Sequence, residues 1–173
     1  KDITKTLLIA LVLMYIVLAG LYESFMYPLL IFMIIPLSLI GVFMIYYLTG
    51  TNFNQSAYIG VIFLFGIVVN NAIVLLDHIN LLKKSKNYFY LKDLLVQAGK
   101  DRARPVLMTM ITTVAGLLPM VITEHGNTKD IWYTLSLSTI GGLVSSTALG
   151  LIVLPVLVFL LEKIKFKWKS LTS

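Results

Sequence analysis

The stretch Gly66-Ile-Val-Val-Asn-Asn-Ala-Ile-Val-Leu-Leu-Asp-His-Ile-Asn80 places amide and carboxylate side chains inside a long apolar run. Apart from its asparagines, the run from Ser56 to Leu76 contains apolar or small residues. A helix of that length, rising about 1.5 Å per residue, crosses a hydrocarbon core about 30 Å thick. Asn70 and Asn71 then lie deep in the membrane, where a polar side chain costs free energy unless it has a partner. We therefore interpret this stretch as a membrane-spanning helix that carries a candidate functional site.

The composition is that of a polytopic membrane protein. Of the 173 residues, 58% are hydrophobic and 13% are charged, and that charged fraction is about half that of an ordinary soluble domain. The net charge is +6, but most of the 14 Lys and Arg residues lie in segments 83–104 and 163–169, which flank apolar runs. Basic residues in these positions anchor helices at the cytoplasmic membrane surface. We therefore expect contacts with membrane lipids and no binding to nucleic acid.

The sequence predicts neither enzyme activity nor a cofactor or metal site. It has no cysteine and only two histidines, which excludes disulfides, thiol ligands and a histidine cluster. It contains no glycine-rich phosphate loop and no nucleophile elbow. The chain begins with Lys1 instead of Met, and the first apolar run has no small-residue cleavage site. We expect it to be a piece of a longer protein.

The pattern of apolar runs predicts an all-α fold, a polytopic membrane helix bundle with five transmembrane helices and one amphipathic surface helix. Segment 83–104 contains both lysines and aromatic or aliphatic residues, so we expect it to lie on the cytoplasmic membrane surface. Segment 162–173 is predicted to be a basic tail. The expected transmembrane helices cover about residues 4–21, 29–48, 55–82, 105–122 and 131–161.

Loop charges predict the orientation of the bundle. If segment 83–104 and the basic tail are cytoplasmic, the loops Thr49–Asn54 and Thr123–Asp130 lie outside, as the positive-inside rule requires. The N-terminus is then outside as well.

Small residues recur every fourth position along the last predicted helix, at Ser138, Gly142, Ser146 and Gly150. A stripe of small side chains lets two membrane helices approach closely. We interpret this stripe as a helix-packing surface.

Four motifs, in this order and spacing, resemble the C-terminal membrane half of the resistance-nodulation-division (RND) exporters, in particular the hydrophobe and amphiphile efflux branch. The resemblance covers essentially the whole chain and corresponds to transmembrane helices eight to twelve of that family. The motifs are Leu21-Tyr-Glu-Ser24 with Pro28, Val69-Asn-Asn-Ala-Ile-Val-Leu-Leu-Asp77, Arg102-Ala-Arg-Pro-Val-Leu-Met-Thr109 with Gly116-Leu-Leu-Pro119, and Gly141-Gly142 with Pro155.

The resemblance implies a proton-driven multidrug or amphiphile exporter of the bacterial inner membrane. Exporters of this branch are homotrimers that work with a periplasmic adaptor and an outer-membrane channel. The N-terminal half and the large extracytoplasmic domains of such a transporter are not in this sequence, and they are implied as its partners. We also considered an RND exporter of metal ions or envelope lipids, and a non-transporting accessory or remnant subunit. The scattered methionines argue against the metal-exporting branch.

The resemblance also implies a proton relay. In the family, two aspartates on the fourth helix face a Lys on the tenth helix and an Arg and a Thr on the eleventh. The matching positions here are Asn70, Arg102 and Thr109, so the Lys is replaced by an amide. A neutral amide stabilises ionised carboxylates less than a Lys does, so the aspartates should hold protons more readily. Asn71 and Asp77 are possible members of a polar track along the same helix.

Each of these residues also has a structural interpretation, which the sequence leaves open. Asn70 and Asn71 are also suited to hydrogen-bonding neighbouring helices, and Asp77 to a solvated position at the membrane boundary. Arg102 by itself indicates an anchor at that boundary. The hydroxyl of Thr109 can donate back to its own helix.

Overall fold

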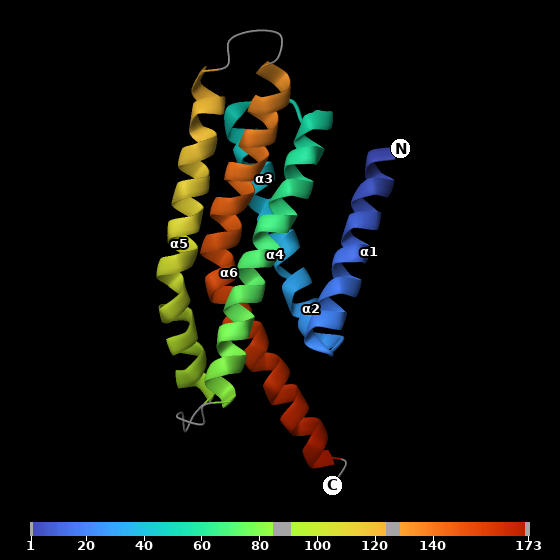
Figure 1. Ribbon diagram of the computed structural model, residues 1–173, viewed down its shortest axis with the longest axis vertical. Coiled ribbons are helices and arrows are strands. Elements are labelled where there is room, and N and C mark those ends of the chain that lie inside the picture. The colour runs from blue at the N-terminus through green and yellow to red at the C-terminus, as the bar shows by residue number, and fades with distance from the viewer. Residues whose placement is uncertain (1, 85–90, 124–128, 172–173) are drawn as a thin grey trace.

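The computed structural model describes the backbone of residues 2–84, 91–123 and 129–171, all of it helical apart from short connections and without strands in these ranges (Figure 1). Five spans are long and apolar enough to cross a membrane, which confirms the predicted fold class. The N- and C-terminal ends lie at opposite ends of the bundle, as an odd number of crossings requires (Figure 1). The helices are α1 (Asp2–Tyr22), α2 (Met26–Phe32), α3 (Ile34–Thr49), α4 (Gln55–Lys84), α5 (Leu91–Thr123) and α6 (Lys129–Leu171).

The second span is broken into α2 and α3, where the sequence predicted one helix over 29–48. The break at Met33 has a local cause in Pro36. A proline lacks the N–H that would bond to the carbonyl four residues earlier, here Phe32, and its ring crowds that carbonyl. α3 then ends at Gly50, whose φ of 63° is the left-handed conformation that glycine adopts at low cost.

α4 and α6 form the centre of the bundle. Eleven of the 30 residues of α4 are buried, and α4 begins after Asn54, whose Oδ1 accepts a hydrogen bond from the Ala57 N–H at 3.1 Å. This is a helix N-cap, which satisfies one of the unpaired donors of the first turn. α1 lies at the edge of the bundle and approaches it through α2 and the lower part of α4 (Figure 1).

The prediction of a separate surface helix over 83–104 was wrong. Lys83 and Lys84 end α4, and the part from Leu91 onward is the first portion of α5, which continues through Pro105. Leu94, Leu95 and Ala98 of this portion are buried in the core. Its apolar face therefore packs against the protein and not against lipid. Burial of that face against the bundle stabilises the helix ahead of the proline. Residues 85–90, which include part of the predicted amphipathic pattern, lie outside the described residues.

The last helix is longer than predicted. α6 runs from Lys129 to Leu171, so the predicted basic tail continues the helix, and only residues 172–173 of it lie outside the described backbone. The predicted loop over 123–130 is shorter, because Thr123 ends α5 and Lys129 starts α6; residues 124–128 lie outside the described residues. At the opposite end, Lys83 Nζ lies 2.8 Å from Glu162 Oε1 and joins α4 to α6.

Glycines bring the helix backbones together at the centre. A Cβ added to Gly141 on α6 would lie 2.7 Å from the carbonyl oxygen of Gly41 on α3. A Cβ on Gly60 of α4 would lie 2.7 Å from the carbonyl oxygen of Leu135 on α6. No real Cβ approaches backbone this closely, so these positions require glycine at the present helix separation. All four residues of the small-residue stripe are buried on α6, and Gly142 lies against Leu64 of α4 and Val42 of α3.

A tyrosine hydroxyl joins α3 to α6 beside this crossing. Tyr46, which is 6% exposed, donates to the Thr134 carbonyl at 2.7 Å, and its hydroxyl lies 2.9 Å from Ser138 Oγ. Within a membrane bundle the loss of such a bond costs about 0.6–1.7 kcal/mol. We therefore expect Tyr46→Phe to lower the free energy of unfolding of the intact transporter by about 1 kcal/mol. Denaturant unfolding of the purified protein measures this change.

The neighbouring tyrosine supplies a matched control. Tyr47 is 88% exposed, so Tyr47→Phe removes the same hydroxyl from a surface position. The free energy of unfolding of Tyr47→Phe should equal that of the unchanged protein. Equal effects of the two substitutions would show that the α3–α6 hydrogen bonds add nothing to stability.

Candidate functional site

Asn70 lies on the outer face of α4. It is exposed in the described chain, and so are Gly66 and Asp77, which follow the same helical face at spacings of four and seven residues. A Cβ added to Gly66 would meet no atom within 4 Å. Around Gly66 and Asn70, this face of α4 is therefore covered by no other part of the described chain.

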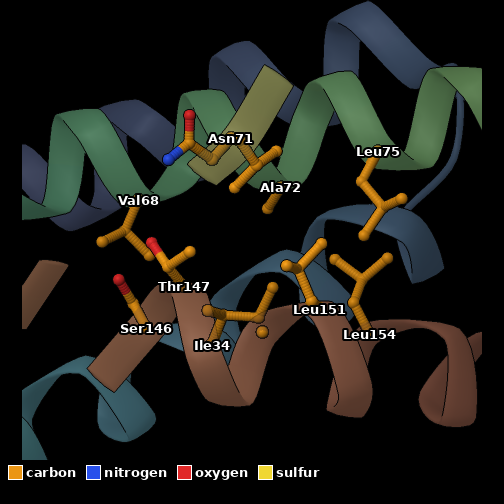
Figure 2. Close-up of a pocket in the computed structure, with 11 residues that line it drawn as sticks. Ile34, Val68, Asn71, Ala72, Leu75, Ser146, Thr147, Leu151 and Leu154 are labelled. Atoms are coloured by element: carbon orange, nitrogen blue, oxygen red, sulfur yellow. The ribbon is translucent and has the colours of Figure 1, made fainter. Parts of the chain in front are cut away.

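Asn71, one residue further, faces the interior. It lines a small cavity of about 20 Å³ between α4 and α6, to which α3 and α5 contribute Ile34 and Val106. Figure 2 shows Asn71 on α4 opposite Thr147 of α6. Thr147 is 4% exposed, and its Oγ1 is buried without a hydrogen-bond partner in the described part of the chain. The two asparagines thus have different surroundings, because successive residues of a helix point about 100° apart.

Thr109 is exposed on α5, and its Oγ1 donates to the Val106 carbonyl at 2.9 Å. This bond to the preceding turn is common for threonine in membrane helices and leaves the oxygen lone pairs free to accept. A Cβ added to Gly116, seven residues further along the helix, would meet nothing within 4 Å. Only four of the 32 residues of the span Leu91–Ile122 are buried. α5 contacts α4 and α6 on one side, and most of its remaining surface is left uncovered by the described residues.

Arg102 is half-buried two turns below Thr109. Its Nε is buried and has no hydrogen-bond partner in the described ranges. Arg104, in the same motif, is exposed. A buried guanidinium donor without an acceptor is unfavourable, because the group loses its bonds to water without replacement.

The described chain does not bring the three predicted relay residues into contact. No hydrogen bond or ion pair joins Asn70, Arg102 and Thr109 to one another within the part of the chain that the structure describes. Each of the three presents polar atoms that the other described helices leave unpaired or uncovered. The arrangement is suited to accept a further polar helix and does not form a closed site by itself.

Asp77 lies at the lower end of α4, beside a cleft of about 440 Å³ between α1 and α4. The cleft is also lined by Tyr22, Glu23, Asn80 and Lys84. Tyr22 donates its hydroxyl to the Ile73 carbonyl at 3.4 Å and so links α1 to α4. Asp77 is exposed here, at the predicted membrane boundary.

One polar pair was missed by the sequence analysis. His78 Nε2 on α4 lies 3.1 Å from Asp101 Oδ2 on α5, and Gln97 Nε2 donates to Asp101 Oδ1 at 2.7 Å. The spacing of 23 residues gives no local signal, since only the packing of α4 against α5 brings these side chains together. No group of three or more His, Asp or Glu side chains that could hold a metal ion occurs among the residues whose side chains are described.

Residues 2–162 match the sequence profile of the AcrB/AcrD/AcrF family. The swarming motility protein SwrC of Bacillus subtilis (strain 168) is 35% identical over 161 residues, which are 93% of this chain and 15% of that protein. The multidrug resistance protein MdtC of Pantoea ananatis (strain AJ13355) is 34% identical over 96% of this chain and 16% of its own length. A crystal structure of a heavy metal efflux pump superposes with a TM-score of 0.81 and 34% identity, over 92% of this chain and 15% of that chain. The chain thus spans less than a fifth of the length of these relatives.

Proposed function

The chain belongs to the AcrB/AcrD/AcrF family of RND efflux transporters, and we propose that it forms part of the membrane domain of a proton-driven exporter of drugs or amphiphiles. It is a multi-pass membrane protein with five candidate spans. The proposed activity is transport across the bacterial inner membrane without covalent chemistry on the substrate. Multidrug export is favoured by the similarity to proteins named for multidrug resistance.

The observation that carries this proposal is the uncovered polar face of α4 and α5. Asn70 and Thr109 are exposed, and Arg102 holds a buried donor without an acceptor in the described chain. Acidic side chains from a further helix would supply acceptors for all three. This chain covers 15–16% of the length of the relatives that it matches. We propose that the rest of the transporter supplies such a helix.

We further propose that these three residues assist proton movement on those acids. Arg102 favours their ionised form by its charge, and Thr109 and Asn70 stabilise one protonation state over the other by donating or accepting hydrogen bonds. Asn70 carries no charge, so the acids should hold their protons to a higher pH than with a Lys at this position. Asn70→Lys in the intact transporter should then move the optimum of proton-coupled efflux to lower pH.

Thr109→Val in the intact transporter tests the hydroxyl directly. Loss of one hydrogen bond to a charged group is worth about 1.5–3 kcal/mol, so we expect proton-coupled dye efflux to fall by about 10-fold or more. Proteoliposomes with an imposed pH gradient and a fluorescent dye provide the measurement. Thr109→Ser, which keeps the hydroxyl, should retain most of the efflux.

Thr112→Val is the matched control, because Thr112 is also exposed on α5 and donates to the Met108 carbonyl at 2.9 Å. It should leave efflux close to that of the unchanged protein. Equal efflux by Thr109→Val and the unchanged transporter would remove Thr109 from the proton pathway.

Metal export is the second candidate, favoured by the similarity to the heavy metal efflux pump. Growth of cells carrying the intact transporter in the presence of copper, silver or zinc ions, compared with growth in dyes and detergents, separates the two substrate classes. A gain in metal tolerance without a gain in dye tolerance would favour metal export.

We also propose that the intact transporter is a homotrimer that works with a periplasmic adaptor and an outer-membrane channel. This rests on the family and on the segments that this chain does not contain. Cross-linking of the purified intact transporter, with trimers as the expected product, tests the oligomeric state.

A further inference from the structure

A groove of about 490 Å³ lies between the first part of α5 and the last part of α6. Its α6 side is apolar and includes Ile152, Val156 and Phe159, all of them exposed. Its α5 side carries Lys92 and Lys100, which are also exposed. A surface that is apolar on one side and basic on the other matches the boundary between acyl chains and anionic headgroups.

Two lysines of α5 share the face that lines the groove. Lys92, Val96 and Lys100 follow one another at spacings of four and all line the groove. Asp101, the acid next to Lys100, is instead bonded to Gln97 and to His78 of α4. No carboxylate lines the groove among the residues whose side chains are described. The electrostatic potential of the groove therefore favours a negatively charged ligand.

A glycine keeps the groove open. Gly99 lies in the interior of α5, where glycine is less favourable than alanine or leucine. A Cβ added there would meet no atom within 4 Å, so close packing within the described chain does not require a glycine at this position. Its structural effect is to leave space between Lys100 and the apolar side of α6.

We propose that this groove binds an anionic phospholipid of the cytoplasmic leaflet. The phosphate lies between Lys92 and Lys100, and one acyl chain lies along Ile152, Val156 and Phe159. The cytoplasmic position follows from the basic residues of this end of the bundle, since such residues mark the cytoplasmic side. The two lysines select anionic over zwitterionic headgroups, and the apolar side selects a lipid over a free phosphate. This site does not depend on proton coupling or on the exported substrate.

Native mass spectrometry of the purified intact transporter in detergent tests the proposal. The probes are dioleoyl phosphatidylglycerol and dioleoyl phosphatidylcholine, added at equal concentrations. We expect a retained phosphatidylglycerol adduct on the unchanged protein and weaker retention of phosphatidylcholine. Lys92→Gln combined with Lys100→Gln should weaken phosphatidylglycerol binding by about 30-fold, since each lysine near a membrane surface contributes about 1 kcal/mol, or about 5-fold.

Gly99→Leu tests the space independently of charge. The added side chain enters the open groove and leucine favours the helix, so the variant is expected to fold and to lose the adduct. Lys84→Gln is the matched charge control, because Lys84 is exposed at the end of α4 and does not line the groove. It should bind phosphatidylglycerol like the unchanged protein.

Three results would overturn the proposal. The first is a failure of selective binding to the unchanged protein, seen as equal binding of both lipids or as no retained lipid. The absence of any lipid would indicate that a protein segment covers the groove. The second is an equal loss of adduct in Lys84→Gln and the double lysine variant. The third is displacement of the lipid by millimolar inorganic phosphate, which would show that the apolar side plays no part. The experiment measures lipid binding and not transport. The lipid-binding proposal would therefore stand even if the transport proposal failed.

Discussion

Arg102→Ala in the intact transporter is expected to reduce proton-coupled efflux by about 100-fold without reducing the amount of folded protein. The reason is the position of the guanidinium. Arg102 is half-buried, and its Nε has no hydrogen-bond partner in the described part of the chain. If acids of the remaining transporter are its partners, removing the cation leaves those carboxylates without the charge that stabilises their ionised form. A loss of about 2–5 kcal/mol is typical when one partner of such a buried pair is removed.

Arg104→Ala is the control for this experiment. Arg104 belongs to the same Arg-Ala-Arg motif but is exposed, so it reports on the loss of a basic residue at the membrane boundary. Dye efflux from proteoliposomes, driven by an imposed pH gradient, should be near normal for Arg104→Ala and nearly absent for Arg102→Ala. Arg102→Lys should recover part of the efflux, because it keeps the charge and loses the fork of donors. Normal efflux by Arg102→Ala would contradict the proposed relay. It would favour the alternative that Arg102 anchors the helix at the membrane boundary.

The five spans could be predicted from the sequence because membrane insertion depends on local hydropathy, which the apolar runs contain. The boundaries that were wrong depend on contacts between distant segments. The portion of α5 before Pro105 was predicted to lie on the membrane surface, since its amphipathic pattern suits either lipid or protein. Leu94, Leu95 and Ala98 are buried against the bundle instead. No pattern within 83–104 distinguishes these two partners.

For the candidate site, the sequence identified residue types but not their surroundings. Asn70 and Asn71 are adjacent and chemically identical, yet Asn70 is exposed and Asn71 lines the cavity between α4 and α6. The direction of each side chain depends on the rotation of α4 within the bundle, which only packing determines. The pairing of His78 with Asp101 depends in the same way on how α4 and α5 meet. The acids that the resemblance implies for the relay belong to a helix that this chain does not contain.

The sequence also does not show which glycines are required for helix packing, since this depends on which backbone approaches each glycine. Gly20 and Gly141 both lie in apolar helical runs, and the sequence around them does not distinguish their packing. In the structure, a Cβ on Gly20 would meet nothing within 4 Å. A Cβ on Gly141 would lie 2.7 Å from the Gly41 carbonyl oxygen and 3.0 Å from Ile45 Cβ. The two positions therefore predict opposite results for the same substitution.

Gly141→Leu is expected to prevent folding of the transporter's membrane domain. The first atom of the new side chain overlaps a backbone oxygen, which cannot rotate away as a flexible side chain can, so α3 and α6 must separate. Their separation would also break the bonds from Ser145 Oγ to the Leu37 and Ser38 carbonyls, at 3.3 and 3.1 Å. Overpacking of a core costs about 1–3 kcal/mol, and overlap with backbone should place the cost at or above the upper value. Gly141→Ala should show a smaller loss, because alanine adds only the overlapping methyl group.

Gly20→Leu provides the comparison, with the same substitution on a helix face that no other described residue covers. Fluorescence-detected size-exclusion chromatography of both variants, extracted from membranes, measures the folded fraction, and heating before extraction gives the midpoint of unfolding. Gly20→Leu should elute like the unchanged protein, because leucine favours the helix more than glycine does. Gly141→Leu should give little or no folded protein, with Gly141→Ala between them. If Gly141→Leu folds with an unchanged midpoint, α3 and α6 do not meet through these glycines, and their close crossing is not the contact that holds the bundle together.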